Sequence, residues 1–156
     1  MRAGYFVICL AGLTSAATVS AADAPRHYVP SPLPGAAAPA PPFSNGVMAG
    51  GTFYVAGHIG MDPATQKAAA GVDAEVHLML DGMKKTLASE GLTMDDLVSV
   101  TVYCTDLSLY DTFNTVYRGY FHEPYPARAF IGVSQLVRGA HFEIMGVAVK
   151  SRGAGR

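Results

Sequence analysis

The segment LVSVTVYCT, residues 97–105, alternates apolar with polar side chains and therefore predicts a half-buried β-strand. Helical patterns lie on both sides of this segment. Residues 73–90 place apolar side chains at helical spacing along one face, and residues 108–121 place aromatic side chains along one side before prolines end the pattern. A strand between two such helices is typical of a domain in which helices pack on a sheet.

Four further strands are expected around this unit. A hairpin joins residues 47–49 to residues 52–56 through Gly50-Gly51, whose freedom to adopt positive φ suits a two-residue turn. Residues 127–133 and 141–150 form the last two strands. The predicted order is β-β-α-β-α-β-β, an α+β domain with two helices packed on one face of a mixed sheet.

The first 22 residues have the pattern of a secretory signal peptide. Arg2 supplies a positive charge, residues 5–13 are apolar, and small residues lead to Ala21 and Ala22, where cleavage is expected. A membrane anchor is the alternative, but a span needs ~20 predominantly apolar residues, and Thr and Ser interrupt this run. The protein is therefore expected to be periplasmic or secreted, with no membrane attachment after cleavage.

The remainder of the chain divides into a linker, one domain and a tail. Residues 23–42 are rich in Pro and Ala, which favours an extended linker or a strap on the surface. The folded domain is expected over residues 43–150. Residues 151–156 are expected to form a flexible tail.

The charge of the chain argues against one class of partner. Its 156 residues include 11 Lys and Arg and 12 Asp and Glu, a formal net charge of −1, and no block of like charges. A protein that binds nucleic acid without regard to sequence needs a cationic face to displace counterions. No nucleic-acid partner is therefore expected.

No metal or cofactor is expected either. The two cysteines, Cys9 and Cys104, cannot build a disulfide framework or a Cys-based zinc site. The five histidines are not spaced as a zinc pair on a helix, and the chain has no phosphate-binding glycine loop and no nucleophile elbow. A lone histidine such as His58 is more often a satisfied core or surface residue than a ligand.

Two charged residues stand alone in apolar strands. Arg128 is the only charge in residues 127–133, and Glu143 is the only charge in residues 142–147. They could point to solvent or pair with each other across the sheet, since charges are rarely buried without a partner. Alternatively, a guanidinium on a rigid strand offers a bidentate fork to a small carboxylate, and a carboxylate near it holds or deprotonates a water molecule.

Six short motifs run through the domain in order. They are PFSN at 42–45, YVAGHI at 54–59, VTVYCTD at 100–106, FNTVY at 113–117, PAR at 126–128 and FEI at 142–144. With these motifs the chain, from about residue 42 to residue 150, resembles the RidA/YjgF/YER057c/UK114 family of reactive intermediate (imine) deaminases. The resemblance implies a chorismate-mutase-like α+β fold and a homotrimer whose sites lie between subunits.

The resemblance also implies a reaction and the roles of particular residues. Characterised members hydrolyse small 2-imino or enamine acids, such as 2-iminobutanoate and 2-iminopropanoate, to 2-oxo acids and ammonia, without a cofactor. Arg128 matches the arginine that binds the substrate carboxylate, and Glu143 matches the carboxylate that positions water. Phe43, Gly57 and Phe130 match substrate-binding positions of the same cleft. Phe43 stands where deaminating members usually carry Tyr, and Phe130 where they carry Cys, so the cleft is expected to be more apolar.

Two other functions fit the same sequence. Phe43 and Phe130 mildly favour a non-catalytic periplasmic module that binds a small carboxylate or a partner protein on the same trimeric fold. Ribonuclease activity is attached to some relatives, but the acidic net charge and the lack of a basic stripe argue against it.

A trimer would also cover the face of the sheet that the helices leave open. The aliphatic residues expected to suit a contact with another subunit are Ile131, Val133, Ile144 and Val147.

Overall fold

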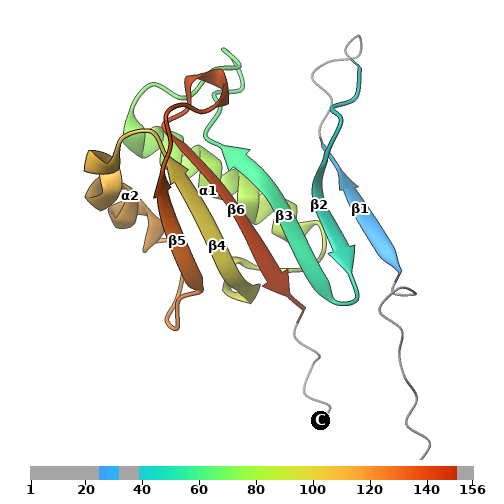
Figure 1. Ribbon diagram of the computed structural model, residues 1–156. Helices are drawn as coiled ribbons and strands as arrows, with labels where there is room; N and C mark the ends of the chain where they lie inside the picture. The colour runs from blue at the N-terminus through green and yellow to red at the C-terminus, as the bar shows by residue number, and fades with distance from the viewer. Residues whose placement is uncertain (1–24, 32–38, 151–156) are drawn as a thin grey trace, which may run out of the picture.

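The computed structural model describes residues 25–31 and 39–150, drawn in Figure 1. The predicted signal peptide and C-terminal tail lie outside the described residues. The helices are α1, Val72–Ala88, and α2, Tyr110–Tyr117, and short 3-10 turns lie at Met94–Asp96, Leu107–Leu109 and Val137–Gly139. The strands are β1, Arg26–Pro30; β2, Ser44–Ala49; β3, Thr52–Ile59; β4, Leu97–Cys104; β5, Ala127–Gly132; and β6, Phe142–Val149.

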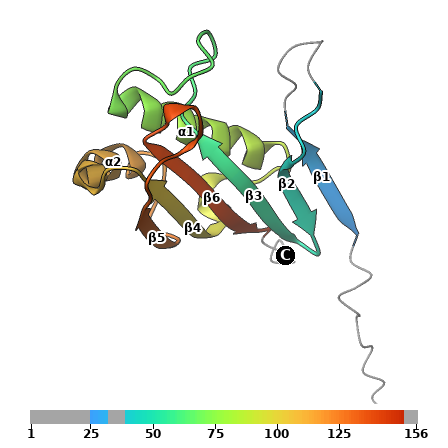
Figure 2. The same cartoon turned by 45° about the horizontal axis from the view of Figure 1, so that its top comes forward.

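The strands form one six-stranded sheet in the order β1-β2-β3-β6-β4-β5. Strand β5 runs parallel to β4, and the other neighbouring pairs are antiparallel, so the sheet is mixed. Both α-helices pack on the same face (Figures 1 and 2). The predicted fold class, two helices on one face of a mixed sheet, is confirmed. None of the described helices is both long enough and apolar enough to cross a membrane.

The core fills the space between the helices and the sheet. Side chains at helical spacing on α1 and alternate side chains of β3, β4 and β6 belong to one buried apolar cluster. Full burial of each such side chain contributes about 1.5–3 kcal/mol. The largest fully buried apolar side chains are Phe53, Phe113, Phe142, Met79, Leu80, Met83, Leu87, Ile144, Val76, Val100 and Val102. This packing fixes the positions of β5 and β6, the two strands that carry the candidate site.

The predicted hairpin is also confirmed. Gly50 and Gly51 join β2 to β3 with φ values of 56° and 89°, the left-handed backbone region that favours glycine.

Strand β1 is absent from the predicted element order and lies inside the segment predicted as a linker. It pairs with β2 as an edge strand, and most of its side chains are exposed, so no apolar alternation marks it in the sequence. Pro30 ends the strand at a register shift, a position that tolerates a residue without an N–H group. His27 Nδ1 lies 2.9 Å from Glu90 Oε1, near the end of α1.

Three details near other elements also differ from the prediction. Helix α1 begins at Val72 and ends two residues before the predicted position, and α2 ends at Tyr117 rather than near residue 121. Val98 belongs to the apolar set of the alternation in residues 97–105, but it is 49% exposed because the register shifts between Leu97 and Ser99.

A buried carboxylate ties α1 to the start of β6. Glu75 is fully buried and accepts hydrogen bonds from the backbone N–H groups of His141, at 2.6 Å, and Phe142, at 3.0 Å. Its second oxygen lies 2.7 Å from His141 Nδ1. These bonds satisfy the buried carboxylate and hold the first residues of β6, directly before Glu143.

The opposite face of the sheet, which no described helix covers, is largely apolar. Large apolar residues that point from it toward solvent are Tyr54, Ile131, Met145 and Val149. Of the residues predicted to meet another subunit, Ile131 lies on this face, whereas Ile144 is fully buried under the helices and was wrongly included. Its neighbours in β6 alternate between the two faces, and Ile144 takes the core side.

Candidate functional site

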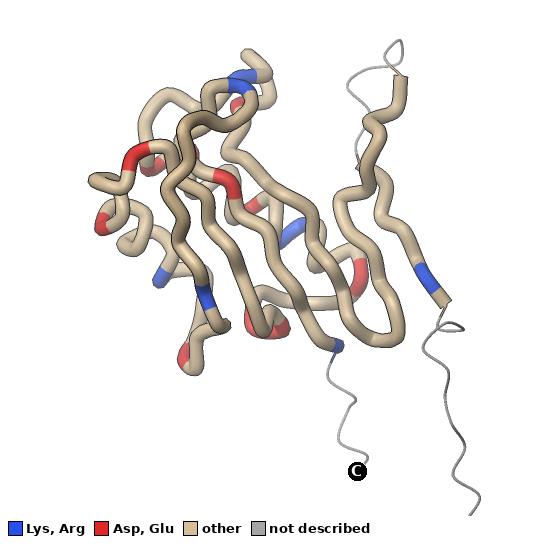
Figure 3. The backbone as a smooth tube through the Cα atoms, in the orientation of Figure 1, with Lys and Arg blue, Asp and Glu red and all other residues tan. Residues whose placement is uncertain are grey.

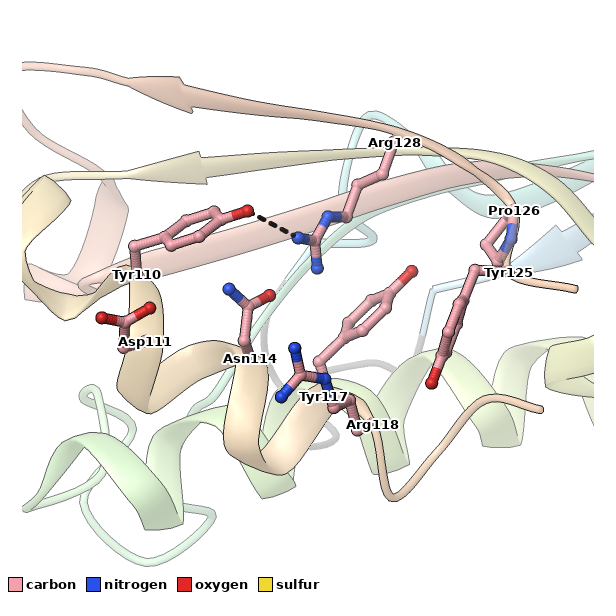
Figure 4. A pocket seen from close by; sticks show the side chains of 8 residues that line it. All are labelled: Tyr110, Asp111, Asn114, Tyr117, Arg118, Tyr125, Pro126 and Arg128. Carbon is pink, nitrogen blue, oxygen red and sulfur yellow. Dashed lines mark hydrogen bonds between the residues drawn. The ribbon is translucent and has the colours of Figure 1, made fainter. Parts of the chain in front are cut away.

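Arg128 lies on the edge strand β5 and points to the face of the sheet that carries the helices. Its strand partner Val100 is buried in the core, and Phe130, two residues further along β5, packs against Phe113 of α2. Since alternate residues of a strand share a face, Arg128 and Phe130 both point toward α2. Figure 4 shows the guanidinium between the strand and this helix.

Aromatic rings surround the Arg128 guanidinium. Its central carbon lies 4.6 Å from the centre of the Tyr117 ring and 5.8–5.9 Å from the ring centres of Tyr110, Phe113 and Phe130. Nη2 donates a hydrogen bond to Tyr110 Oη at 3.3 Å. The ion pairs of the described residues, which have N···O distances up to 4.0 Å, do not include Arg128. The cation is therefore held by rings and one hydroxyl rather than by a carboxylate.

A cavity of about 320 Å³ opens beside the guanidinium (Figure 4). We call it the Arg128 cavity. Its lining comes from α2 and from the chain just before and within β5: Tyr110, Asp111, Asn114, Tyr117, Arg118, Tyr125, Pro126 and Arg128. Its size is at the lower end of small-molecule sites, roughly 300–1,000 Å³.

Tyr117 supplies an unused donor at the wall of this cavity. The residue is 4% exposed, and its hydroxyl has no hydrogen-bond partner among the described residues. Burial raises the pKa of Tyr117 to about 12, against the opposing attraction of Arg128. The hydroxyl is therefore protonated at neutral pH and can donate a hydrogen bond.

Glu143 lies on the other face of the sheet. Its neighbours in β6, Phe142 and Ile144, point into the core, so Glu143 points away from the helices. Burial raises the pKa of the half-buried Glu143 carboxyl. No hydrogen bond or ion pair within the described part of the chain involves this side chain.

Gly57 makes room for this carboxylate. The register between β3 and β6 shifts between Val55 and His58, and Gly57 lies in the shifted part. A Cβ atom built at Gly57 would collide with Glu143 Oε1. The structure thus brings together two of the predicted site residues, Gly57 and Glu143, with backbone on one side of the carboxylate.

Arg128 and Glu143 are not neighbours within one chain. Tyr103 of β4 pairs with Ile131 of β5 on one side and with Glu143 of β6 on the other. Glu143 is therefore level with Ile131, which lies three residues after Arg128, and β6 is two strands away from β5. At about 3.3 Å per residue and about 4.8 Å between strands, the Cα atoms are roughly 14 Å apart. Their side chains also occupy opposite faces. The alternative that they form a cross-strand salt bridge is therefore wrong.

Phe43 and Phe130, the other predicted site residues, do not line the Arg128 cavity. Phe43 is 58% exposed just before β2 and does not line the Arg128 cavity. The Phe130 ring lies behind the guanidinium, in edge-on contact with Tyr110 at 4.9 Å and Phe113 at 5.2 Å. The Phe130 ring therefore packs beside α2 and does not line the Arg128 cavity.

Both ring nitrogens of half-buried His58 have hydrogen-bond partners within the chain. Its Nδ1 lies 2.8 Å from the Ala56 carbonyl oxygen, its Nε2 lies 2.9 Å from Thr86 Oγ1, and burial lowers its pKa. Over residues 25–31 and 39–150, no three His, Cys, Asp or Glu side chains are grouped to hold a metal ion.

Residues 34–150 match the family model described as Endoribonuclease L-PSP. The chain belongs to this family. Its relatives include the 2-iminobutanoate/2-iminopropanoate deaminase of Homo sapiens, 36% identical over 110 residues, which are 70% of this chain and 80% of that protein. The protein of the same name from Dermatophagoides farinae is 31% identical over 126 residues, 80% of this chain and 97% of that protein. The resemblance to the RidA family is confirmed.

Solved structures of the family share the fold. RidA from the Antarctic bacterium Psychrobacter sp. superposes with a TM-score of 0.68 at 30% identity, over 78% of this chain and 94% of that one. The structure of Escherichia coli TdcF with bound serine gives a TM-score of 0.68 at 30% identity, over 80% of this chain and 94% of that one.

Sequence reasoning missed the aromatic surroundings of Arg128. Tyr110 and Tyr117 were expected on the apolar side of the second helix, but their hydroxyl groups beside the guanidinium were not foreseen. The spacing of these residues on α2 is the only signal in the sequence, and it does not show which strand α2 packs against.

The contact between Gly57 and Glu143 predicts a coupled pair of substitutions. Gly57→Ala places a methyl group where the carboxylate lies, so it is expected to destabilise the wild-type protein by about 1–3 kcal/mol. In a Glu143→Ala background the carboxylate is gone, and the same change should cost less than about 0.5 kcal/mol. Urea unfolding of the four proteins measures both values. Equal losses of stability in the two backgrounds would show that the contact with Glu143 is not the reason why Gly57→Ala destabilises the protein.

Proposed function

We propose that this protein hydrolyses small 2-imino acids to 2-oxo acids and ammonia. The observation that carries the proposal is the Arg128 guanidinium, which faces a cavity of ligand size and has no carboxylate partner among the described residues. The deaminase names of the two relatives above support this substrate class.

Arg128 binds the substrate carboxylate. A guanidinium presents two parallel N–H donors that match a carboxylate, and this geometry adds orientation to charge attraction. The rings of Tyr117 and Phe130 and the hydroxyl of Tyr110 restrict the side chain before substrate arrives. A carboxylate fixed in this way presents the adjacent imine carbon in one direction.

Glu143 positions and deprotonates the attacking water. The water oxygen adds to the carbon of the protonated imine while one water proton passes to the carboxylate, and the product is a neutral carbinolamine. The Glu143 carboxyl group then returns this proton to the nitrogen. The C–N bond breaks and ammonia leaves, while the carbinolamine hydroxyl gives its proton to the Glu143 carboxylate and becomes the carbonyl of the 2-oxo acid. Because burial raises the pKa of Glu143, its carboxylate is a stronger base than an exposed one.

This mechanism needs a second copy of the chain. Arg128 and Glu143 point to opposite faces of one sheet, so an Arg128 from one subunit must meet a Glu143 and a Gly57 from another. The uncovered apolar face, with Tyr54, Ile131 and Met145 exposed, offers the surface for such an assembly. We propose a homotrimer with its sites between subunits, and Phe43 belongs to the same intersubunit cleft.

A mixing experiment tests the shared site. Arg128→Ala and Glu143→Ala are each expected to remove activity on 2-iminobutanoate, made in situ by an amino-acid oxidase and followed as 2-oxobutanoate. When the two variants are co-expressed in equal amounts, a random assembly pairs an intact arginine with an intact glutamate at roughly a quarter of the interfaces. About a quarter of the wild-type rate should therefore return. Mixed assemblies without activity would refute a site shared between subunits.

The pH dependence tests the role of Glu143. The carboxylate is active only when deprotonated, so kcat/KM should fall as pH decreases through its pKa. Because burial raises that pKa, the midpoint should lie above the ordinary glutamate value of about 4.3. Glu143→Gln should remove the fall of kcat/KM at low pH, the acidic limb of the pH profile, and lower kcat by about 10²–10⁴-fold. A limb that persists in the Gln variant would assign the titration to another group.

A binding module without catalysis is the second candidate. The Arg128 cavity is built by one chain alone, so it can hold a small carboxylate without any contribution from Glu143. If wild-type protein binds 2-oxobutanoate in calorimetry but leaves the rate of imine hydrolysis unchanged, this function replaces the enzymatic one.

Ribonuclease activity has less support, although it appears in the description of the family. Figure 3 shows the described Lys and Arg residues spread over separate elements, with Asp and Glu between them. RNA binding depends on gathered positive charge.

We also propose that the protein is exported. The support is the sequence pattern of residues 1–22, with Arg2 followed by the apolar residues 5–13. Sequencing the N-terminus of protein isolated from the periplasm or medium should find a start directly after Ala21 or Ala22. Full-length protein in the cytoplasm would contradict export.

A further inference from the structure

A second guanidinium lines the Arg128 cavity, and the reaction proposed above does not use it. Arg118 follows the last residue of α2, and its side chain is exposed and lines the cavity together with Asn114, one turn earlier (Figure 4). Residues four apart lie on the same face of a helix, so both side chains belong to the face of α2 that lines the cavity. Neither arginine takes part in an ion pair of the described residues.

Neither guanidinium of the cavity has a carboxylate partner among the described residues. Asp111 is the only acidic residue of the lining. It lies seven residues before Arg118 on α2, about 10 Å along the helix axis. Within the described residues its carboxylate is not within 4.0 Å of either guanidinium. A substrate with a single carboxylate that is bound by Arg128 therefore leaves Arg118 unmatched.

The cavity also contains uncharged hydrogen-bond donors. The Tyr117 ring centre lies 4.6 Å from the central carbon of the Arg128 guanidinium, and its hydroxyl is protonated and has no hydrogen-bond partner among the described residues. Asn114 contributes an amide. A cavity with two guanidinium groups, a free hydroxyl and an amide offers more donors than one carboxylate can accept.

We propose that Arg118 binds a second acidic group of the substrate, so that the preferred substrates are dicarboxylic 2-imino acids of four or five carbons. This inference rests on the proposed function, since it names the substrate class of the same site. Arg128 holds the carboxylate beside the imine carbon, and Arg118 holds the carboxylate at the far end. Arg118 is thus a specificity-determining residue that leaves the chemical step to Arg128 and Glu143.

The test compares two imines and two variants. Wild-type protein should hydrolyse 2-iminoglutarate with a higher kcat/KM than 2-iminobutanoate, each made in situ from its amino acid by an oxidase. Arg118→Gln should lower kcat/KM for 2-iminoglutarate about tenfold or more, the loss expected for a charge-assisted hydrogen bond, and change that for 2-iminobutanoate less than about twofold. Arg118→Lys should restore part of the preference.

Lys85→Gln is the matched control, because Lys85 is an exposed cation on α1 that does not line the Arg128 cavity. It should leave both rates unchanged. An equal loss on both imines in Arg118→Gln, or no loss on either, would overturn the proposal. The first result would mean that Arg118 acts through the fold, for example by its position at the C-terminus of α2.

Binding measurements distinguish a failure of this inference from a failure of the proposed function. Calorimetry with 2-oxoglutarate and 2-oxobutanoate needs no turnover. If wild-type protein hydrolyses neither imine, the proposed deaminase function fails. Tighter binding of 2-oxoglutarate that is lost in Arg118→Gln would then still support the role of Arg118, and equal binding of the two oxo acids by the wild type and the variant would refute it.

Discussion

Consecutive side chains of a β-strand point to opposite faces of the sheet, and the arrangement of the whole site depends on this constraint. In β6, Phe142 and Ile144 occupy the core, which leaves Glu143 on the uncovered face. In β5, the pairing of Arg128 with buried Val100 directs the arginine toward the helices. No rotamer change brings these two charges together within one chain. A reaction that needs both of them needs two chains, and the apolar uncovered face is where a second chain can pack.

The site retains two charges that have no internal counterion. A half-buried charge without a partner lowers stability, because part of its hydration is lost without compensation. Arg128 is instead placed against four aromatic rings, and Glu143 lies against the backbone at Gly57. Both arrangements restrict the side chain and leave its charge available. This is the arrangement expected for groups that act on a ligand rather than on each other.

Packing around Arg128 also explains how this chain accommodates an aromatic residue at position 130. The Phe130 ring fits edge-on against Tyr110 and Phe113, and aromatic pairs of this kind contribute about 0.5–1.5 kcal/mol each beyond their buried area. The ring stabilises the contact between β5 and α2 without entering the lining of the Arg128 cavity. On the other side of the domain, buried Glu75 holds the backbone of His141 and Phe142, so the position of Glu143 is set from α1.

The amino-acid pattern alone determined most of the elements and singled out the two charges of the candidate site. Apolar alternation in residues 97–105, helical spacing in residues 73–90 and the glycines of the hairpin are local signals, and the structure contains the strand, the helix and the turn that they predict. Exposed β1 carries no such signal, since an edge strand is stabilised by backbone pairing rather than by its side chains. Only the tertiary structure decided which face each charge takes, which rings surround Arg128, and that Arg118 shares its cavity. These depend on strand register and on the packing of α2 against β5, which bring together residues far apart in the chain.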